Sequence, residues 1–286
     1  MTKTTPIPDL APLRAEIDRI DEAMHRLLME RGEIIDRLVE VKRLQGGEGG
    51  SAFRPAREAA MMRRLVDRHG GLLPLDTVES IWRVIISTFT YVQAPYAVHA
   101  DLSVGEAPMR DSARFHFGFT TPFVSHIGPR AVVEAVAVSS GDLGLLPAVV
   151  LPGGDPWWSA LEGEKAPKII ARLPFVERSD HPAALPVFVV SHPIADAAVT
   201  EIEVWSVHAS HWVPQAAAAF AGRGELLAAA VEGRPDAAAL LMSIPAGSRD
   251  AGLDALTQAG ARIAAFHFVG GHAAPYRLGS DGTARS

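Results

Sequence analysis

Apolar residues recur every three or four positions through the first 44 residues of the chain. They fall at positions 10, 13, 17, 20, 24, 27, 28, 34, 35, 38 and 41. This period is typical of one amphipathic helix, with Asp9 suited to the N-cap and Pro12 to the first turn. Gly46 and Gly47 end the pattern, so we expect a helix over roughly residues 10–44. At 1.5 Å per residue it would be about 50 Å long, which favours an intertwined bundle or a coiled-coil dimer.

Two further amphipathic helices are expected before residue 94. The first begins around Phe53–Glu58 and runs to about His69, with its inner face formed by Met61, Met62 and Leu65. The second runs from about Pro74 to Gln93. Its predicted inner stripe consists of Val78, Ile81, Trp82, Ile85, Phe89 and Val92.

All three predicted helices place at least one polar residue on the apolar side. Arg31 and Lys42 fall within about 20° of the centre of the first stripe, and Glu58 lies at the centre of the second. Gln93 lies at the edge of the third. A buried unpaired charge is strongly disfavoured, so Arg31 and Lys42 need anionic partners, either an internal Asp or Glu or a bound anion. Together the four residues describe a small polar pocket between helices, and its excess of cations suits a dicarboxylate.

The pattern of residues after position 94 indicates a multidomain protein with an α/β C-terminal region. Prolines at positions 95 and 108 and the lack of a sustained period indicate a linker over 95–111. Short β-branched runs then predict an α/β lobe over 112–198 and a βαββαβ domain over 199–278, followed by a disordered tail over 279–286. The elements expected in the βαββαβ domain are Glu201–Val207, Pro214–Ala221, Leu226–Val231, Ala238–Ile244, Asp250–Ala259 and Ile263–Val269.

Composition removes several classes of function. The 286 residues carry a formal net charge of −6, which argues against a nucleic-acid partner. The absence of cysteine excludes disulfides, thiolate metal sites and cysteine nucleophiles. We find neither a signal peptide nor an apolar run long enough for a membrane span, and therefore expect a cytoplasmic protein. No dinucleotide fingerprint or P-loop occurs, so we expect no cofactor. The 11 histidines are scattered along the chain, and we interpret them as surface residues and expect no metal site.

The helical region resembles a known family in both spacing and residue types. The matching residues are Leu13-Arg14-x-x-Ile17-Asp18-x-x-Asp21, Glu30-Arg31, Val41-Lys42, Arg54-Pro55-x-Arg57-Glu58 and Ile81-Trp82-Arg83-x-Ile85-Ile86. Over residues 9–94 the chain resembles the all-helical chorismate mutases. The resemblance implies a three-helix, intertwined homodimer that converts chorismate to prephenate by a Claisen rearrangement, without a cofactor.

The geometry of the first helix agrees with this dimer on one point. Arg14 precedes Arg31 by 17 residues, which is about 25 Å along a helix and about 100° around it. The two side chains cannot serve one small pocket within a single chain. In the family, the arginine equivalent to Arg14 enters the active site of the partner subunit, where it and Arg31 would clamp the substrate carboxylates.

The resemblance also assigns roles to the other polar residues. Lys42 and Gln93 would donate hydrogen bonds to the ether oxygen, where negative charge grows as the C–O bond breaks. Glu58 would accept the ring hydroxyl of the substrate, supported by Arg57. Many members have a small hydroxyl residue four positions before the glutamine, where this chain has Phe89, and the change is expected to alter substrate affinity.

Two shorter resemblances concern the C-terminal region. Gly118–His126 and Gly141–Pro147 resemble an opening strand-to-helix loop and a later strand of prephenate dehydratase. The Glu-Asn and Thr-Arg-Phe motifs of that family are replaced by Val149-Val150 and Pro186-Val187-Phe188, which predicts a catalytically degenerate lobe. The Phe220-Ala221-x-Arg223-Gly224 and Glu232-Gly233-Arg234-Pro235 segments resemble the ferredoxin-like ACT domain, but His211-Trp212-Val213 replaces its effector-binding signature.

Two other functions remain open for the helical region. Isochorismate pyruvate lyase shares this type of bundle and also follows a pericyclic route. A regulatory or interaction protein could retain the mutase site as a relic. The presence of all five charged site residues argues against loss of the site, namely Arg14, Arg31, Lys42, Arg57 and Glu58.

Overall fold

The computed structural model describes residues 10–44, 51–148, 154–194 and 200–278. The chain divides into two compact units, residues 1–48 and residues 49–286. The predicted N-cap Asp9, the glycines at 46 and 47, Val149-Val150 and the predicted tail over 279–286 lie outside the described residues.

The described part of the first unit is one helix, α1, over Ala11–Leu44. The predicted long helix is therefore confirmed. None of its residues is buried, and Leu13 and Leu27 on its apolar stripe are each 61% exposed. An amphipathic helix gains most of its stability by packing its apolar face, so α1 carries a face suited to contact with other helices.

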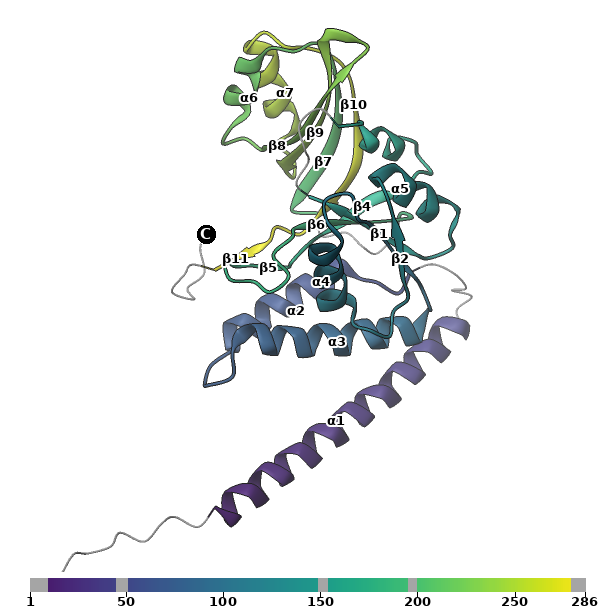
Figure 1. The fold of residues 1–286 in the computed structure, drawn as a ribbon, viewed down its shortest axis with the longest axis vertical. Coiled ribbons are helices and arrows are strands. Elements are labelled where there is room, and N and C mark those ends of the chain that lie inside the picture. The colour runs from purple at the N-terminus through teal and green to yellow at the C-terminus, as the bar shows by residue number, and fades with distance from the viewer. Residues whose placement is uncertain (1–9, 45–50, 149–153, 195–199, 279–286) are drawn as a thin grey trace, which may run out of the picture. The chain divides into compact units, whose positions relative to one another are not determined.

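The second unit begins with two helices, α2 over Pro55–Arg68 and α3 over Leu75–Gln93 (Figure 1). Both were predicted. Pro55 suits the start of α2, because the first N–H groups of a helix have no partner within it. Met62 and Leu65 are buried on α2 as predicted.

The predicted inner stripe of α3 is not the face that this unit buries. The buried residues of α3 are Glu79, Arg83, Ile86, Ser87 and Thr90. In contrast, Ile81 and Val92 from the predicted stripe are 38% and 54% exposed. Because α3 packs on α4 through its more polar side, its apolar stripe remains at the surface of the unit. The periodicity thus identified an apolar face that this unit by itself does not bury.

The rest of the second unit, as far as it is described, has two halves, whose strands form a nine-stranded sheet and a separate two-stranded sheet (Figure 1). Its first half contains β1 (Val98–Asp101), α4 (Glu106–Phe117), β2 (Phe123–His126), α5 (Pro129–Val138), β3 (Leu143–Pro147), the 3-10 helix η1 (Trp157–Leu161), β4 (Lys168–Leu173), β5 (Val176–Glu177) and β6 (Val187–Ser191). Its second half contains β7 (Ile202–His211), α6 (Pro214–Phe220), β8 (Glu225–Glu232), β9 (Arg234–Pro245), α7 (Arg249–Gln258), β10 (Arg262–His272) and β11 (Tyr276–Arg277). The strand order is β2-β1-β3-β6-β4-β10-β7-β9-β8, and β5 pairs with β11 in a separate two-stranded sheet.

The linker prediction for residues 95–111 is wrong. This range contains β1 and the first half of α4, and Tyr96, Val98 and Ala100 are almost fully buried. β1 pairs in parallel with both β2 and β3 and lies next to β2 at one edge of the sheet. Consequently Gly118–His126 is not an opening strand-to-helix loop, because it leads from the end of α4 into β2.

The second half shows the predicted βαββαβ order of elements, β7-α6-β8-β9-α7-β10. Its four strands are antiparallel neighbours in the order β10-β7-β9-β8, and a common core joins α6 and α7 to one face of them (Figure 1). On the other face, one core joins α5 and η1 to β7, β8, β9 and β10. The boundary predicted at residues 198 and 199 therefore does not separate two cores.

The two halves of the sheet meet where β10 pairs with β4, with Gly270 opposite Ile169. Gly270 has φ +138°, and a Cβ at this position would lie 2.1 Å from the carbonyl oxygen of Ile169. Glycine is required here because both the backbone conformation and the close approach exclude a side chain. The adjacent tryptophans Trp157 and Trp158 are 4% and 1% exposed and pack in the core that joins η1 to the sheet.

Among the described helices, none combines the length and the hydropathy of a segment that could span a bilayer.

Candidate functional site

Three of the predicted site residues, Arg14, Arg31 and Lys42, lie on α1. Arg14 is exposed, whereas Arg31 and Lys42 are half-buried. The helix is unbroken over its 34 residues, so the separation of Arg14 from Arg31 is about 25 Å at 1.5 Å per residue. Within one chain, therefore, these two guanidinium groups do not converge on a small ligand.

The other three predicted residues lie in the second unit. Arg57 is exposed in the first turn of α2, and Glu58 beside it is 5% exposed. Gln93 is half-buried at the end of α3, where its Nε2 donates a hydrogen bond to the carbonyl oxygen of Phe89 at 3.0 Å. The carboxylate and the amide thus belong to the unit that also carries the sheet.

Glu58 forms a buried ion pair that the sequence did not predict. Arg83 of α3 donates from one guanidinium nitrogen to Oε2 of Glu58 at 2.5 Å, and the two side chains are 1% and 6% exposed. A second nitrogen of Arg83 donates to the carbonyl oxygen of His116 at 2.9 Å. The guanidinium also lies over the ring of Phe175, 5.3 Å from its centroid. Arg83 therefore fixes the orientation of the Glu58 carboxylate.

Further titratable groups surround this pair in a nearly dry environment. Burial, followed by the charges of Arg83 and His181, lowers the pKa of His116 well below its ordinary value. The ring of His181 stacks on His116 at 6.0 Å, and its Nε2 lies 3.4 Å from Oε2 of Glu79. Burial also raises the pKa of Tyr96 to about 12. The polar side of α3 thus meets a low-dielectric interior in which Glu58 and Arg83 interact strongly.

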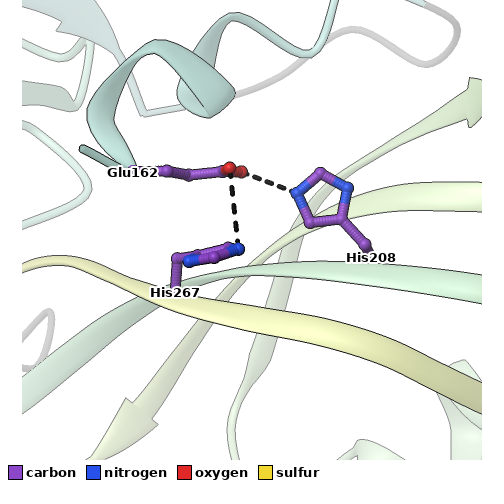
Figure 2. A group of neighbouring side chains, drawn as sticks. All are labelled: Glu162, His208 and His267. Carbon is purple, nitrogen blue, oxygen red and sulfur yellow. Dashed lines mark hydrogen bonds and ion pairs between the residues drawn. The ribbon is translucent and has the colours of Figure 1, made fainter.

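A second cluster of chemical groups was missed by sequence reasoning. Glu162, at the end of η1, lies beside His208 of β7 and His267 of β10 (Figure 2). Burial lowers the pKa of His208, but hydrogen bonds to Glu232 and Glu162 outweigh it and raise the pKa above its ordinary value. No sequence pattern pointed to the cluster, because its members come from three elements and all histidines had been interpreted as surface residues.

The helical region matches a family model. The model of chorismate mutase type II matches residues 13–94, which run from α1 through the end of α3. Residues 13–94 therefore form a chorismate mutase type II domain, and the boundary between the two compact units falls inside it.

Curated relatives extend the similarity beyond this domain. A bifunctional chorismate mutase/prephenate dehydratase of Neisseria gonorrhoeae is 34% identical over 109 residues, which cover 38% of this chain and 28% of that protein. A protein of the same name from Aquifex aeolicus is 29% identical over 143 residues, covering 49% of this chain and 38% of the relative. The similarity thus spans well under half of the length of these relatives. No solved structure matches the chain.

Proposed function

We propose that this protein is a chorismate mutase, which rearranges chorismate to prephenate in the biosynthesis of phenylalanine and tyrosine. The observation that carries the proposal is the match of residues 13–94 to chorismate mutase type II, together with the presence of Arg14, Arg31, Lys42 and Glu58 on its helices. The reaction is an intramolecular bond exchange. It needs positioned charges and hydrogen-bond donors and no nucleophile, which suits a site made of guanidinium, ammonium, amide and carboxylate groups.

The active unit in this proposal is a homodimer with two sites, each built from both chains. Two observations support it. The unbroken α1 keeps Arg14 about 25 Å from Arg31, and the apolar stripes of α1 and α3 both remain exposed. Packing between helices of two copies would cover these stripes and bring Arg14 of the partner subunit to Arg31.

Each polar residue then has a distinct task. Arg31 and Arg14 of the partner subunit bind the two carboxylates of chorismate through charge-assisted hydrogen bonds. Lys42 and Gln93 donate to the ether oxygen, and these bonds strengthen as negative charge develops there in the transition state. In the structure, the amide of Gln93 donates to its own helix, so it would exchange that bond for the substrate.

Glu58 accepts the ring hydroxyl of chorismate, and Arg57 supports it from the first turn of α2. To this set we add Arg83 as a positioning residue. Arg83 occupies Oε2 of Glu58, which leaves Oε1 for the substrate. Because Arg83 holds the Glu58 side chain in one orientation, the carboxylate meets the hydroxyl as a preformed acceptor.

For the C-terminal region we propose a dehydratase-like lobe that has lost its activity, followed by an ACT-like domain. The βαββαβ order of β7 to β10 supports the second part. The first part is supported by Pro186 and Val187, which stand where the dehydratase motif would place a threonine and an arginine. Val187 begins the fully buried strand β6. We expect no effector binding through the usual signature, because Trp212 and Val213 replace it.

The test is the loss of chorismate absorbance on addition of purified, full-length protein, with acid conversion of the product to phenylpyruvate. The proposal predicts turnover by the wild-type chain and a drop of about 10²–10³ in rate for Lys42→Ala, the size of effect seen when one transition-state donor is lost. Prephenate should yield no phenylpyruvate above the uncatalysed rate at neutral pH. Pyruvate release from isochorismate without turnover of chorismate would instead identify a lyase, and binding without either reaction would identify a relic site.

A further inference from the structure

A group of metal-binding side chains lies far along the chain from the proposed mutase site (Figure 2). Glu162, His208 and His267 each offer one ligand atom, and these atoms all lie within 4.8 Å of one another. Nε2 of His208 is 2.7 Å from Oε1 of Glu162, and Nε2 of His267 is 3.8 Å from Oε2. We propose that these three side chains bind a divalent transition-metal ion of the zinc class.

The sheet holds the two histidines on one face. In the antiparallel pairing of β7 with β10, His267 lies opposite Ser206 and His208 lies opposite Ala265. Because alternate residues of a strand share a face, Ser206, His208 and His267 point to the same side of the sheet. The imidazole rings stand in an edge-to-face arrangement with centroids 5.8 Å apart.

The carboxylate is held over this face by its own set of contacts. Trp158 and Leu161 of η1 are buried in the core directly before Glu162. The ammonium of Lys168 donates to the carbonyl oxygens of Leu161 and Gly163, which fixes the turn that carries Glu162. The hydroxyl of Ser206 donates to Oε1 of Glu162 at 2.6 Å. The third ligand is therefore positioned before any ion arrives.

His208 has the outer partner that metal-binding histidines usually have. Its Nδ1 lies 2.9 and 3.0 Å from the two carboxylate oxygens of Glu232, so Nδ1–H donates to Glu232. A carboxylate in this place orients the ring and directs Nε2 toward the metal. Without a metal, Nε2 must also carry a proton to bond Glu162, so a metal ion would replace that proton between the imidazole and the carboxylate.

The spacing and the donor types select the kind of ion. With metal–ligand distances of about 2.1 Å, the ligand atoms of a tetrahedral site lie about 3.4 Å apart. The observed distances of 2.7 and 3.8 Å lie on either side of this value. Two imidazoles and one carboxylate suit zinc, cobalt and nickel, whereas magnesium and calcium prefer oxygen ligands alone. Three protein ligands would leave the fourth position open to water, on the side where His267 is 43% exposed.

The experiment is a calorimetric titration of Zn²⁺ into untagged, full-length protein that has been dialysed against a chelator. We expect one ion bound per chain. His267→Gln should weaken binding at least 100-fold, and Glu232→Gln, which removes only the outer partner, should weaken it about 10–100-fold. His211→Gln is the matched control, because His211 lies on the same strand as His208 and pairs with Asp236 outside the cluster. It should bind Zn²⁺ like the wild type.

Co²⁺ provides a second readout, since a tetrahedral site gives it an intense visible spectrum. We expect this spectrum in the wild type and its loss in His267→Gln. Circular dichroism of each variant checks that the sheet has folded. The proposal is overturned if the wild type binds no stoichiometric Zn²⁺, or if folded His267→Gln binds it as tightly as the control, since His208 would then be only an ion-pair partner of Glu162 and Glu232.

Discussion

His272 is expected to make the stability of the second unit depend on pH. The side chain lies at the end of β10, is 3% exposed, and donates from Nδ1 to the carbonyl oxygen of Ala273 at 2.9 Å. Burial lowers its pKa from 6.5 to about 4. The folded protein therefore keeps His272 neutral at a pH where the unfolded chain already binds a proton. Stability is complete above about pH 7 and is lost as the pH falls from 6.5 toward 4.

The size of the loss follows from the two pKa values. A pKa difference of one corresponds to about 1.36 kcal/mol, so the full penalty below pH 4 is about 3 kcal/mol. At pH 5 the unfolded state is almost fully protonated at this position and the folded state is not. The free energy of unfolding should then be about 2 kcal/mol lower than at pH 7.5 from this residue alone.

Urea unfolding followed by circular dichroism at pH 7.5, 6.5, 5.5 and 5.0 measures the effect. His272→Asn is the control, because its amide can still donate to the carbonyl of Ala273 but does not titrate. Other groups contribute equally to both proteins, so the difference in free energy of unfolding between wild type and variant should change by about 2 kcal/mol between pH 7.5 and pH 5. A difference that stays constant over this range would refute the argument that burial keeps His272 neutral.

Two further predictions concern stability. Arg83→Leu leaves Glu58 buried without its cation and should lower the free energy of unfolding by about 3–5 kcal/mol. The control Arg63→Leu breaks a partly exposed pair with Glu201 and should lower it by about 1 kcal/mol or less in the same urea titration. Equal losses in the two variants would contradict a strong buried pair of Arg83 with Glu58. Gly270→Ala places a Cβ against the backbone of Ile169 and should cost about 2–4 kcal/mol. Gly222 also has positive φ but has open space around it, so Gly222→Ala should cost only about 1–2 kcal/mol by the same measurement. A larger loss for Gly222→Ala than for Gly270→Ala would contradict the close approach of β10 to β4.

The elements that the sequence predicted well are those with strong periodicity. The recurring apolar positions of α1 extend over almost ten turns, and the alternating strands β7 to β10 are separated by clear turn residues, so both regions were found with nearly correct bounds. β1 was missed because it has only four residues. Pro108 in the first turn of α4 was read as a breaker, although proline is tolerated there.

The candidate site was predicted in part, and the reason lies in its contacts. The positions of Lys42 and Glu58 on apolar faces could be read from helical periodicity alone. Arg83 falls off the predicted apolar stripe of α3 and was given no role, because nothing in the sequence shows that α4 covers this side of the helix. Contacts between distant elements, such as Arg83 with His116 or Glu162 with His208, depend on the tertiary arrangement and leave no periodic signal.

The central claim is that chorismate is rearranged in sites built from α1 of two chains, and a subunit-mixing experiment tests it most directly. Arg14→Ala and Arg31→Ala chains are purified separately, assayed for loss of chorismate absorbance, then mixed in equal amounts and allowed to exchange. Each parent should be nearly inactive, because every site carries one defect. In a mixed dimer one site receives both defects and the other receives neither, so after complete exchange about a quarter of all sites should be intact and activity should recover to about a quarter of the wild type. Complete exchange without recovery would contradict the account, because Arg14 would then not complete the site of a partner subunit.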